Sequence, residues 1–315
     1  MTSSVLIDDA AHTAQELSAL HAPVASMRDY VTLMKPGVML LVVFTGAVGL
    51  WLAPAPMHPF LQALTIISIA LGSGGGAVLN MWFDRDMDIL MKRTQNRPIP
   101  AGRIAADDAL VMGIILSIFS VGLLGIATNW FAASILAFAI FFYAVIYTML
   151  LKRRTVQNIV IGGAAGAFPP VIGWAAATGD TALLPWLLFA IVFIWTPPHF
   201  WALALYRHED YKQANVPMLP VIKGETSTKR HILGYSIALV IVSLSPWFLS
   251  SVGSVYGLSA LLLGAIFLRH ALRVLHSDVA RDAMALFGFS ILYLFALFSA
   301  LLADMFIATL LGHSF

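Results

Sequence analysis

The sequence Gly74-Gly-Gly-Ala-Val-Leu-Asn80-Met-Trp-Phe-Asp84-Arg-Asp-Met-Asp88 ends a long apolar stretch and decides how the chain is interpreted. Asn80, Asp84 and Asp88 recur every four residues, so a helix places them on one face. Carboxylates beside hydrocarbon are costly, and inside a membrane segment they indicate a functional site. Amide and carboxylate oxygens suit Mg²⁺ held together with substrate phosphates. We therefore predict a Mg²⁺ site at the end of a membrane-embedded helix.

Composition places the chain in a membrane. Of its 315 residues 60% are hydrophobic and 11% charged, whereas a soluble domain is roughly half apolar and a quarter charged. The expected fold is an all-α membrane protein with nine transmembrane helices in a single domain, residues 1–315, in which 1–34 form a cytoplasmic tail and an interfacial segment. The nine apolar stretches are 37–55, 61–82, 108–127, 130–151, 157–178, 182–205, 231–251, 255–272 and 284–311.

The basic residues predict the orientation. All 18 lie before the first stretch or around the connections that follow the second, fourth, sixth and eighth. The positive-inside rule then puts the N-terminus in the cytoplasm and the C-terminus on the opposite side, as an odd number of spans requires. The two long connections, 83–107 and 206–230, are both cytoplasmic and can face each other. Residues 9–22 are expected to form a tail, and 25–35 a short interfacial helix.

Cations follow the acidic stripe, as a diphosphate site requires. Arg97, with Arg93 or its neighbour Lys92, would neutralise the charge of a departing diphosphate beside the metal. The alternative is an interfacial loop whose salt bridges neutralise one another. Asp86 lies between the two stripe carboxylates but faces elsewhere on a helix, so a structural role is expected for it.

The sixth apolar stretch contains Trp195-Thr-Pro-Pro-His199-Phe-Trp201. Its two prolines should break the helix, and such breaks at membrane depth are tolerated where backbone lines a cavity or is buried in protein. His199 can bind or orient a ligand, or ligate haem iron. The alternative, favoured over iron ligation, is a histidine bonded to the freed carbonyls. In the next connection, Asp210 with Lys212 is a candidate second contact to Mg²⁺ and phosphate, with simple solvation as the alternative.

Two further stretches hold candidate residues. Tyr143-x3-Tyr147-x4-Lys152-Arg153-Arg154 ends the fourth span, where orientation alone requires basic residues. Tyr147 can nevertheless lie over the reactive centre, where the π face of its ring would stabilise an allylic cation. The glycine-rich stretch that begins at Gln157-Asn158 indicates either close helix packing or room for a flat, bulky ligand.

These motifs resemble those of the UbiA-type intramembrane prenyltransferases. The Asn80/Asp84/Asp88 stripe with Arg97-Pro98 is similar to the diphosphate motif of that family. Three stretches resemble the branch that farnesylates haem: 157–167, 195–201 and 210–220. The resemblance runs from Lys35-Pro36 to the ninth span. It implies nine helices around a central cavity that opens to the cytoplasm.

The resemblance also implies a reaction, in which a farnesyl group passes from farnesyl diphosphate to a vinyl group of haem B. Water adds, and haem O and diphosphate are the products. We assign catalysis to Asp84, Asp88, Arg97, Lys152 and Tyr147, metal ligation to Asn80, Asp84, Asp88 and Asp210, and substrate contacts to Arg93, Arg153, Lys212, His199, Trp201 and Asn158. Relatives that form quinones resemble Asp-x3-Asp in the second connection. Here Tyr206 stands four residues before Asp210, so symmetric binding of two Mg²⁺ ions is in question.

Two other functions stay open at this point. A UbiA-type enzyme acting on an aromatic quinone or chlorophyll precursor shares the first motif, and the Pro-Pro-His-Phe-Trp stretch separates it from the haem branch. A secondary transporter also contains buried carboxylates and broken helices, but a basic loop on one side only suits diphosphate better. The expected location is the bilayer of a bacterial cytoplasmic membrane, with haem A synthase or a terminal oxidase assembly as candidate partners. No nucleic-acid signal is present.

Overall fold

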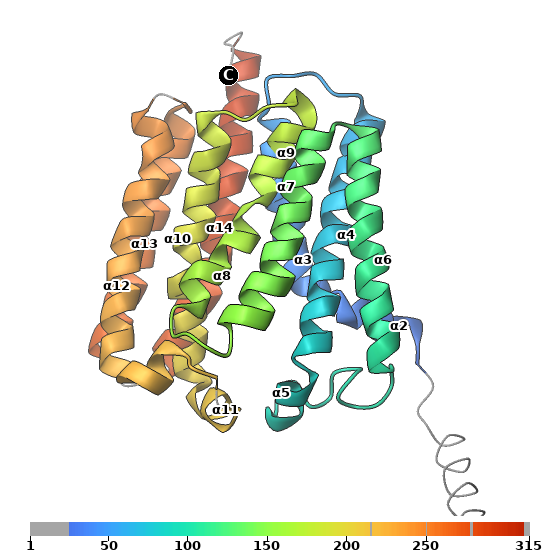
Figure 1. Ribbon diagram of the computed structural model, residues 1–315. Coiled ribbons are helices and arrows are strands. Elements are labelled where there is room, and N and C mark those ends of the chain that lie inside the picture. Colours follow the sequence, from blue (N-terminus) through green and yellow to red (C-terminus); the bar gives the residue numbers. More distant parts are fainter. Residues whose placement is uncertain (1–24, 215, 250, 278–279, 312–315) are drawn as a thin grey trace, which may run out of the picture.

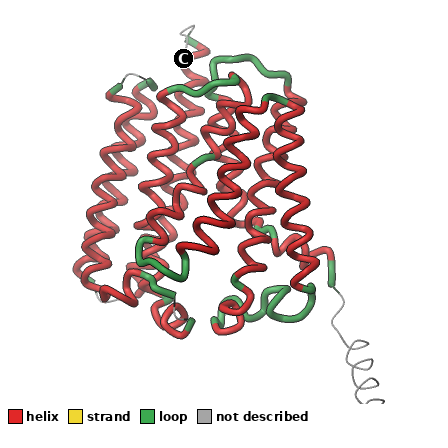
Figure 2. The backbone as a smooth tube through the Cα atoms, viewed as in Figure 1, coloured by secondary structure: helices red, strands yellow, loops and turns green. Residues whose placement is uncertain are grey.

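The computed structural model describes residues 25–214, 216–249, 251–277 and 280–311 as helices joined by loops (Figures 1 and 2). The expected tail over 9–22 lies outside these residues. The helices are α2 Met27–Leu33, α3 Pro36–Trp51, α4 Pro59–Phe83, α5 Arg85–Leu90, α6 Ala106–Ala127, α7 Trp130–Phe141, η1 Phe142–Leu151, α8 Asn158–Ala167, α9 Pro169–Thr178, α10 Leu183–Tyr206, α11 His208–Gln213, α12 Leu219–Phe248, α13 Ser254–His276 and α14 Ala280–Leu310.

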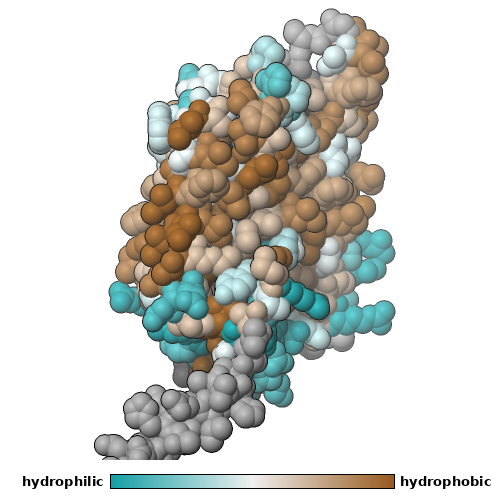
Figure 3. Space-filling model, turned by 90° about the vertical axis from the view of Figure 1, so that its right-hand side faces the viewer, coloured by the Kyte–Doolittle hydropathy of each residue, from teal (hydrophilic) through white to brown (hydrophobic). Residues whose placement is uncertain are grey.

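Length and composition let eight of the described helical segments cross a membrane, or nine when the bent pair α2–α3 counts as one span. The expected all-α fold is therefore confirmed, with α7 and η1 forming one span and α8 and α9 another. Figure 3 shows a broad hydrophobic band over one side of the bundle, with hydrophilic residues gathered below it. Apolar side chains of α6 such as Ile115 and Ile118 are 59% and 69% exposed, as lipid-facing residues must be.

The spans form a closed bundle. Neighbouring spans pack in chain order, from α3 and α4 round to α13 and α14, and α14 returns to contact α3. The short helices α5 and α11 lie at one end of the bundle, and the described C-terminal residues lie at the other (Figure 1). Helix α9 contacts α3, α4, α7 and α10, so it fills the interior of the half away from α5 and α11.

The first span begins with a sharp bend. Helix α2 occupies the segment where a short helix was expected, and Ser26 and Asp29 form a capping box at its start. Lys35 then adopts left-handed backbone (φ 52°), and Pro36 starts α3 at an angle of 55° to α2. A residue before proline avoids the right-handed helical region, so the chain turns here.

The broken span is the fifth. A break was expected at Pro197-Pro198, and that expectation is wrong, because α10 runs from Leu183 to Tyr206 with both prolines inside it. The break occurs at Phe168, where Pro169-Pro170 ends α8 and starts α9. Neither proline can donate an amide hydrogen bond back into α8, so the helical hydrogen bonding is interrupted here although α8 and α9 form one span.

Close contact between backbones fixes α9 in the interior. A Cβ atom added at Gly49 of α3 would lie 2.1 Å from the carbonyl oxygen of Pro170, and one at Gly173 would lie 2.1 Å from that of Gly46. Only glycine permits such an approach. At this end of the glycine-rich stretch, helix packing is therefore the correct interpretation.

Candidate active site

The predicted stripe forms where α4 meets α5. Asn80 lies in the last turn of α4, Asp84 joins the two helices, and Asp88 lies in α5. The amide of Asp84 donates to the carbonyl of Asn80 (3.0 Å), and that of Asp88 to the carbonyl of Asp84 (2.9 Å), so the four-residue repeat continues through the junction. The three residues are 3%, 0% and 1% exposed. The stripe is one face, as predicted, and it is buried.

Each stripe carboxylate has a cation from a distant part of the sequence or from the following loop. Lys152 Nζ donates to Asp84 Oδ2, and Arg97 Nη1 donates to Asp88 Oδ2 at 2.7 Å. The side chains of Lys152 and Arg97 are only 18% and 21% exposed. At this burial an ion pair is screened far less than at the surface. Lys152 and Arg97 therefore lie where a leaving group bound at the stripe would need them.

Lys35 is a site residue that the sequence analysis did not identify. Its Nζ donates to Asn80 Oδ1 at 2.6 Å, while Asn80 Nδ2 donates to Asp84 Oδ2 at 2.8 Å and to Thr148 Oγ1 at 3.1 Å. Both ends of the amide are thus engaged, which fixes its orientation. The signal in the sequence was a lysine directly before the proline that starts the first span, but neither the charge map nor the family resemblance assigned it to the site.

Arg153 connects the stripe with Asp86. Its guanidinium donates to both carboxylate oxygens of Asp86, at 2.6 and 2.7 Å, and lies 3.8 Å from Asp84 Oδ1. These hydrogen bonds hold the pKa of Asp86 below its usual range. The side chain of Asp86 is 62% exposed, so Asp86 lies at the margin of the buried site.

The fourth span ends in a π-helix, η1. In a π-helix residues five apart share a face, where an α-helix would place residues three and four apart. Tyr143 and Thr148 share one such interval, and Tyr147 and Lys152 another, with the amide of Lys152 donating to the carbonyl of Tyr147 at 2.8 Å. The Tyr143 and Tyr147 rings stack with centroids 5.7 Å apart. This register turns both Thr148 and Lys152 towards α4.

A glycine makes room for the tyrosine stack. A Cβ atom at Gly162 of α8 would lie 2.2 Å from Cδ2 of Tyr147, whereas one at Gly166 would meet nothing within 4 Å. Gly162 is therefore required by packing against Tyr147, which holds that ring in place beside Tyr143. Gly166, one turn later, faces open space.

The two long connections meet, as expected. Met87 and Met91 share one buried apolar cluster with residues of α8, α10 and the connection that precedes α12: Ile159, Ala204, Ala214, Val216 and Met218. Burial raises the pKa of Tyr211 in α11, while the nearby Arg93 and Arg97 lower it. Charged groups of the first connection therefore lie close to a residue of the second.

The donors suit Mg²⁺. Asp84 Oδ1 is buried and accepts no hydrogen bond, and the same is true of Asp210 Oδ2, which lies 3.8 Å from Arg207. A buried carboxylate oxygen without a donor is expensive, and a hard cation satisfies it. Over the described residues no three His, Asp or Glu side chains gather as a complete ligand set. An ion here would thus rely on a few protein oxygens plus substrate, as Mg²⁺ at phosphates does.

His199 lies in an aromatic sandwich between α10 and α14. Its ring stacks on Trp195 (4.3 Å between centroids) and on Phe287 (4.5 Å), and Nδ1 hydrogen-bonds to Ser290 Oγ at 2.6 Å. The partner is a serine hydroxyl on a neighbouring helix, and not a carbonyl freed by the prolines. The contact engages Nδ1 and so fixes the orientation of the ring.

Three residues that were predicted to contact substrate instead pack within the protein or lie at its surface. Trp201 is 1% exposed and packs edge-on against Tyr235 of α12 at 5.2 Å. Asn158 Nδ2 donates to the carbonyl of Thr155 at 2.6 Å, which fixes the loop after Lys152. Lys212 is exposed on α11.

Comparison with known proteins gives relatives that are more than half identical over most of the chain. The chain is 54% identical over 292 residues to the protoheme IX farnesyltransferase of Erythrobacter litoralis, covering 91% of this chain and 95% of that protein. It is 56% identical over 281 residues to the protein of that name from Afipia carboxidovorans, covering 88% and 90%.

Solved structures share the fold at low identity. A digeranylgeranylglyceryl phosphate synthase superposes with a TM-score of 0.73 at 18% identity, covering 88% of this chain and 98% of that one. A UbiA homolog from Archaeoglobus fulgidus bound to DMAPP and Mg²⁺ gives 0.63 at 16% identity, covering 86% and 99%. The sequence profile of the UbiA prenyltransferase family matches residues 42–310. With nine-tenths of its length aligned to such relatives, this chain belongs to the UbiA prenyltransferase family.

Proposed function

We propose that this protein transfers a farnesyl group from farnesyl diphosphate to a vinyl group of haem B and adds water, giving haem O and diphosphate. The observation that carries the proposal is the buried stripe, in which Asp84 and Asp88 each meet a cation, Lys152 and Arg97, beside a carboxylate oxygen without a hydrogen bond. Relatives more than half identical over nearly the whole chain are named protoheme IX farnesyltransferase. The single domain acts in the cytoplasmic membrane of a bacterium.

Asp84, Asp88 and Asn80 would hold Mg²⁺, and Asp210 is a further ligand from the second connection. A structural neighbour binds Mg²⁺ together with a prenyl diphosphate. When bound, the ion supplies positive charge that stabilises the departing diphosphate. Asn80 is held by Lys35 and Thr148. Its Oδ1 would therefore either release Lys35 on binding the ion or contact both.

The chain's own residues then favour cleavage of the farnesyl carbon–oxygen bond. Arg97, Lys152 and Lys35 bring positive charge to the leaving oxygens, where negative charge develops. The stacked rings of Tyr143 and Tyr147 present π faces that would stabilise the allylic carbon as it becomes positive. Burial of the stripe keeps bulk water from this carbon until the acceptor reacts.

Haem B is the acceptor of the farnesyl group. Its vinyl π electrons attack the allylic carbon as diphosphate leaves with the electron pair of the broken bond. Positive charge then lies on the vinyl carbon next to the ring, water adds there, and one proton is released. We assign His199 to orienting the haem, since its ring is fixed by Ser290, Trp195 and Phe287. Haem A synthase or a terminal oxidase assembly, which would consume haem O, is the expected protein partner.

One experiment separates the candidate functions. Purified protein is incubated with haem B, farnesyl diphosphate and Mg²⁺, and the extracted haem is weighed by mass spectrometry. A haem heavier by one farnesyl group and one hydroxyl supports the proposal, provided that Asp84→Asn protein yields none. Diphosphate release with an aromatic acid in place of haem would instead indicate a quinone-type enzyme. If folded protein releases no diphosphate with either acceptor, the proposed function is wrong and transport becomes the reading to test.

A further inference from the structure

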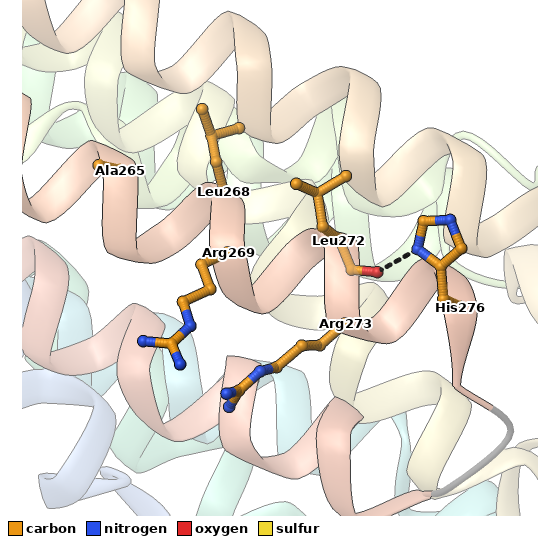
Figure 4. Close-up of a pocket in the computed structure, with 6 residues that line it drawn as sticks. All are labelled: Ala265, Leu268, Arg269, Leu272, Arg273 and His276. Carbon is orange, nitrogen blue, oxygen red and sulfur yellow. Dashed lines mark hydrogen bonds between the residues drawn. The ribbon is translucent and has the colours of Figure 1, made fainter.

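Helix α13 carries an outward-facing surface that the proposed reaction does not use. Six residues of its C-terminal half line a shallow cavity of about 590 Å³ (Figure 4), and they are Ala265, Leu268, Arg269, Leu272, Arg273 and His276. Their spacing of three and four places them on one helical face. The surface joins exposed apolar side chains, such as Leu272 at 45%, to two guanidinium groups. We refer to these six residues as the α13 face.

The depth of Arg269 in the span is unusual for a charged residue. Arg273 and His276 belong to the last turn of α13, where the helix dipole favours cations. Arg269 lies seven residues before the last residue, His276, or about 10 Å along the axis. It is therefore inside a helix long and apolar enough to cross the membrane, where a charge needs a nearby partner.

Among the described residues no aspartate or glutamate forms an ion pair with either arginine of the α13 face. Arg97, Arg103 and Arg153 all pair with aspartates, whereas in the described part of the chain no ion pair involves Arg269 or Arg273. Figure 4 shows both guanidinium groups extending to the same side of α13, away from Leu268 and Leu272. This end of α13 lies at the same end of the bundle as α5 and α11 (Figure 1).

We propose that the α13 face binds an anionic phospholipid of the surrounding bilayer. Arg269 and Arg273 hold the phosphate of the head group, since a guanidinium matches the geometry of phosphate oxygens. Ala265, Leu268 and Leu272 contact an acyl chain of the same lipid. Basic side chains near the end of a span recognise anionic lipid head groups. The ligand class is a phosphatidylglycerol-like lipid with a free negative charge.

The test measures lipid binding and not turnover, so its result is independent of the proposed reaction. Purified protein in detergent is titrated with phosphatidylglycerol or phosphatidylcholine, and bound lipid is counted by native mass spectrometry. The variants are Arg269→Gln, Arg273→Gln and the double variant. The matched control, Arg28→Gln with Lys223→Gln, removes the same charge from two exposed residues of α2 and α12. Inorganic phosphate is added as a competitor in a separate arm.

We expect each single variant to weaken phosphatidylglycerol binding about fivefold and the double variant roughly 30-fold, while the control binds like the wild type. Arg269→Lys with Arg273→Lys should bind more tightly than the double Gln variant and less tightly than the wild type, because the charge is kept and the guanidinium fork is lost; this comparison holds even if a Gln variant folds poorly. Equal retention of phosphatidylglycerol by the double Gln variant would overturn the proposal. So would equal binding of phosphatidylcholine, or displacement of the lipid by millimolar phosphate, which would assign the face to a free anion.

Discussion

Lys35 Nζ donates a 2.6 Å hydrogen bond to Asn80 Oδ1, which ties the start of the first span to the first residue of the acidic stripe. The lysine reaches this position from a backbone in the left-handed region (φ 52°), an uncommon state for a residue with a side chain. Such a conformation is retained where the surrounding structure holds it, and at Lys35 both the following Pro36 and the contact with Asn80 act on the residue.

Replacing Lys35 by Gln should lower the rate of haem O formation by roughly 10- to 100-fold, since a charge-assisted hydrogen bond to a buried amide is lost. The rate is measured against farnesyl diphosphate and Mg²⁺ concentrations. Arg28→Gln, which removes an exposed cation of α2, serves as the control. Unchanged kinetics in the Lys35 variant would show that this lysine serves only the bend before α3.

Asp84→Asn should reduce turnover by more than about a hundredfold, while the protein still inserts and elutes as folded material. The amide keeps the size of the side chain but removes the charge that pairs with Lys152. Asp86→Asn, two residues away and 62% exposed, should stay within about threefold of wild type. The assay is haem O formed per folded protein. Similar activity in the two variants would contradict the placement of the metal on the buried stripe.

Gly162→Ala should impair catalysis, because the new methyl group would lie 2.2 Å from the Tyr147 ring and must displace it from Tyr143. Forced packing of this kind costs about 1–3 kcal/mol, so thermal unfolding should also begin earlier. Gly166→Ala on the same helix meets nothing within 4 Å and should behave like the wild type. The rate of haem O formation and the onset of thermal unfolding are measured for both variants. If the two variants match, the tyrosine stack has no catalytic part.

His199→Ala should harm the use of haem more than that of farnesyl diphosphate. Ser290→Ala should produce a weaker form of the same effect, because it frees a ring that the serine orients. The KM for haem B and the KM for farnesyl diphosphate are determined separately in each variant. An equal rise in both values would mean that His199 only supports the packing of α10 against α14.

Asp304→Ala should destabilise the fold and leave the activity of folded molecules unchanged. The Asp304 carboxylate is 5% exposed and accepts from the amides of Gly253 and Val255, so α14 caps the start of α13. Loss of such a cap costs about 1–2 kcal/mol. Differential scanning fluorimetry should show a lower Tm, whereas Asp108→Asn, an exposed residue of α6, should not. A normal Tm together with lost activity would overturn this structural role.

Much of this architecture is predictable from the sequence. Hydropathy fixes the spans, and the four-residue spacing places Asn80, Asp84 and Asp88 on one buried face. The chain also contains two Pro-Pro pairs in apolar surroundings, and the sequence does not tell which one breaks its helix. Pro197-Pro198 stays helical where α10 is packed between α8, α12 and α14, while Pro169-Pro170 starts α9 against α3. Neighbouring helices decide the outcome, and a local pattern does not contain them.

The register of η1 is likewise not predictable from the sequence. A 3.6-residue period places Tyr143 and Lys152 on opposite faces, nine residues apart, and gives no reason to group them. The π-helix adds residues to each turn, so Tyr143, Thr148 and Lys152 all lie towards α4. The role of Lys35 in the site was not predicted for a different reason: its contact with Asn80 joins residues 45 positions apart.

The backbone contacts of α9 with α3 have a consequence for traffic through the protein. Carbonyl groups of Gly46 and Pro170 lie where not even a methyl group would fit on Gly173 or Gly49, so the backbones of α3 and α9 are in direct contact. Alternating access requires elements that separate in turn, and this packing of α3 against α9 disfavours such a separation. A substrate or product with a long prenyl tail would therefore pass the end of the bundle that carries α5 and α11, or move sideways into lipid.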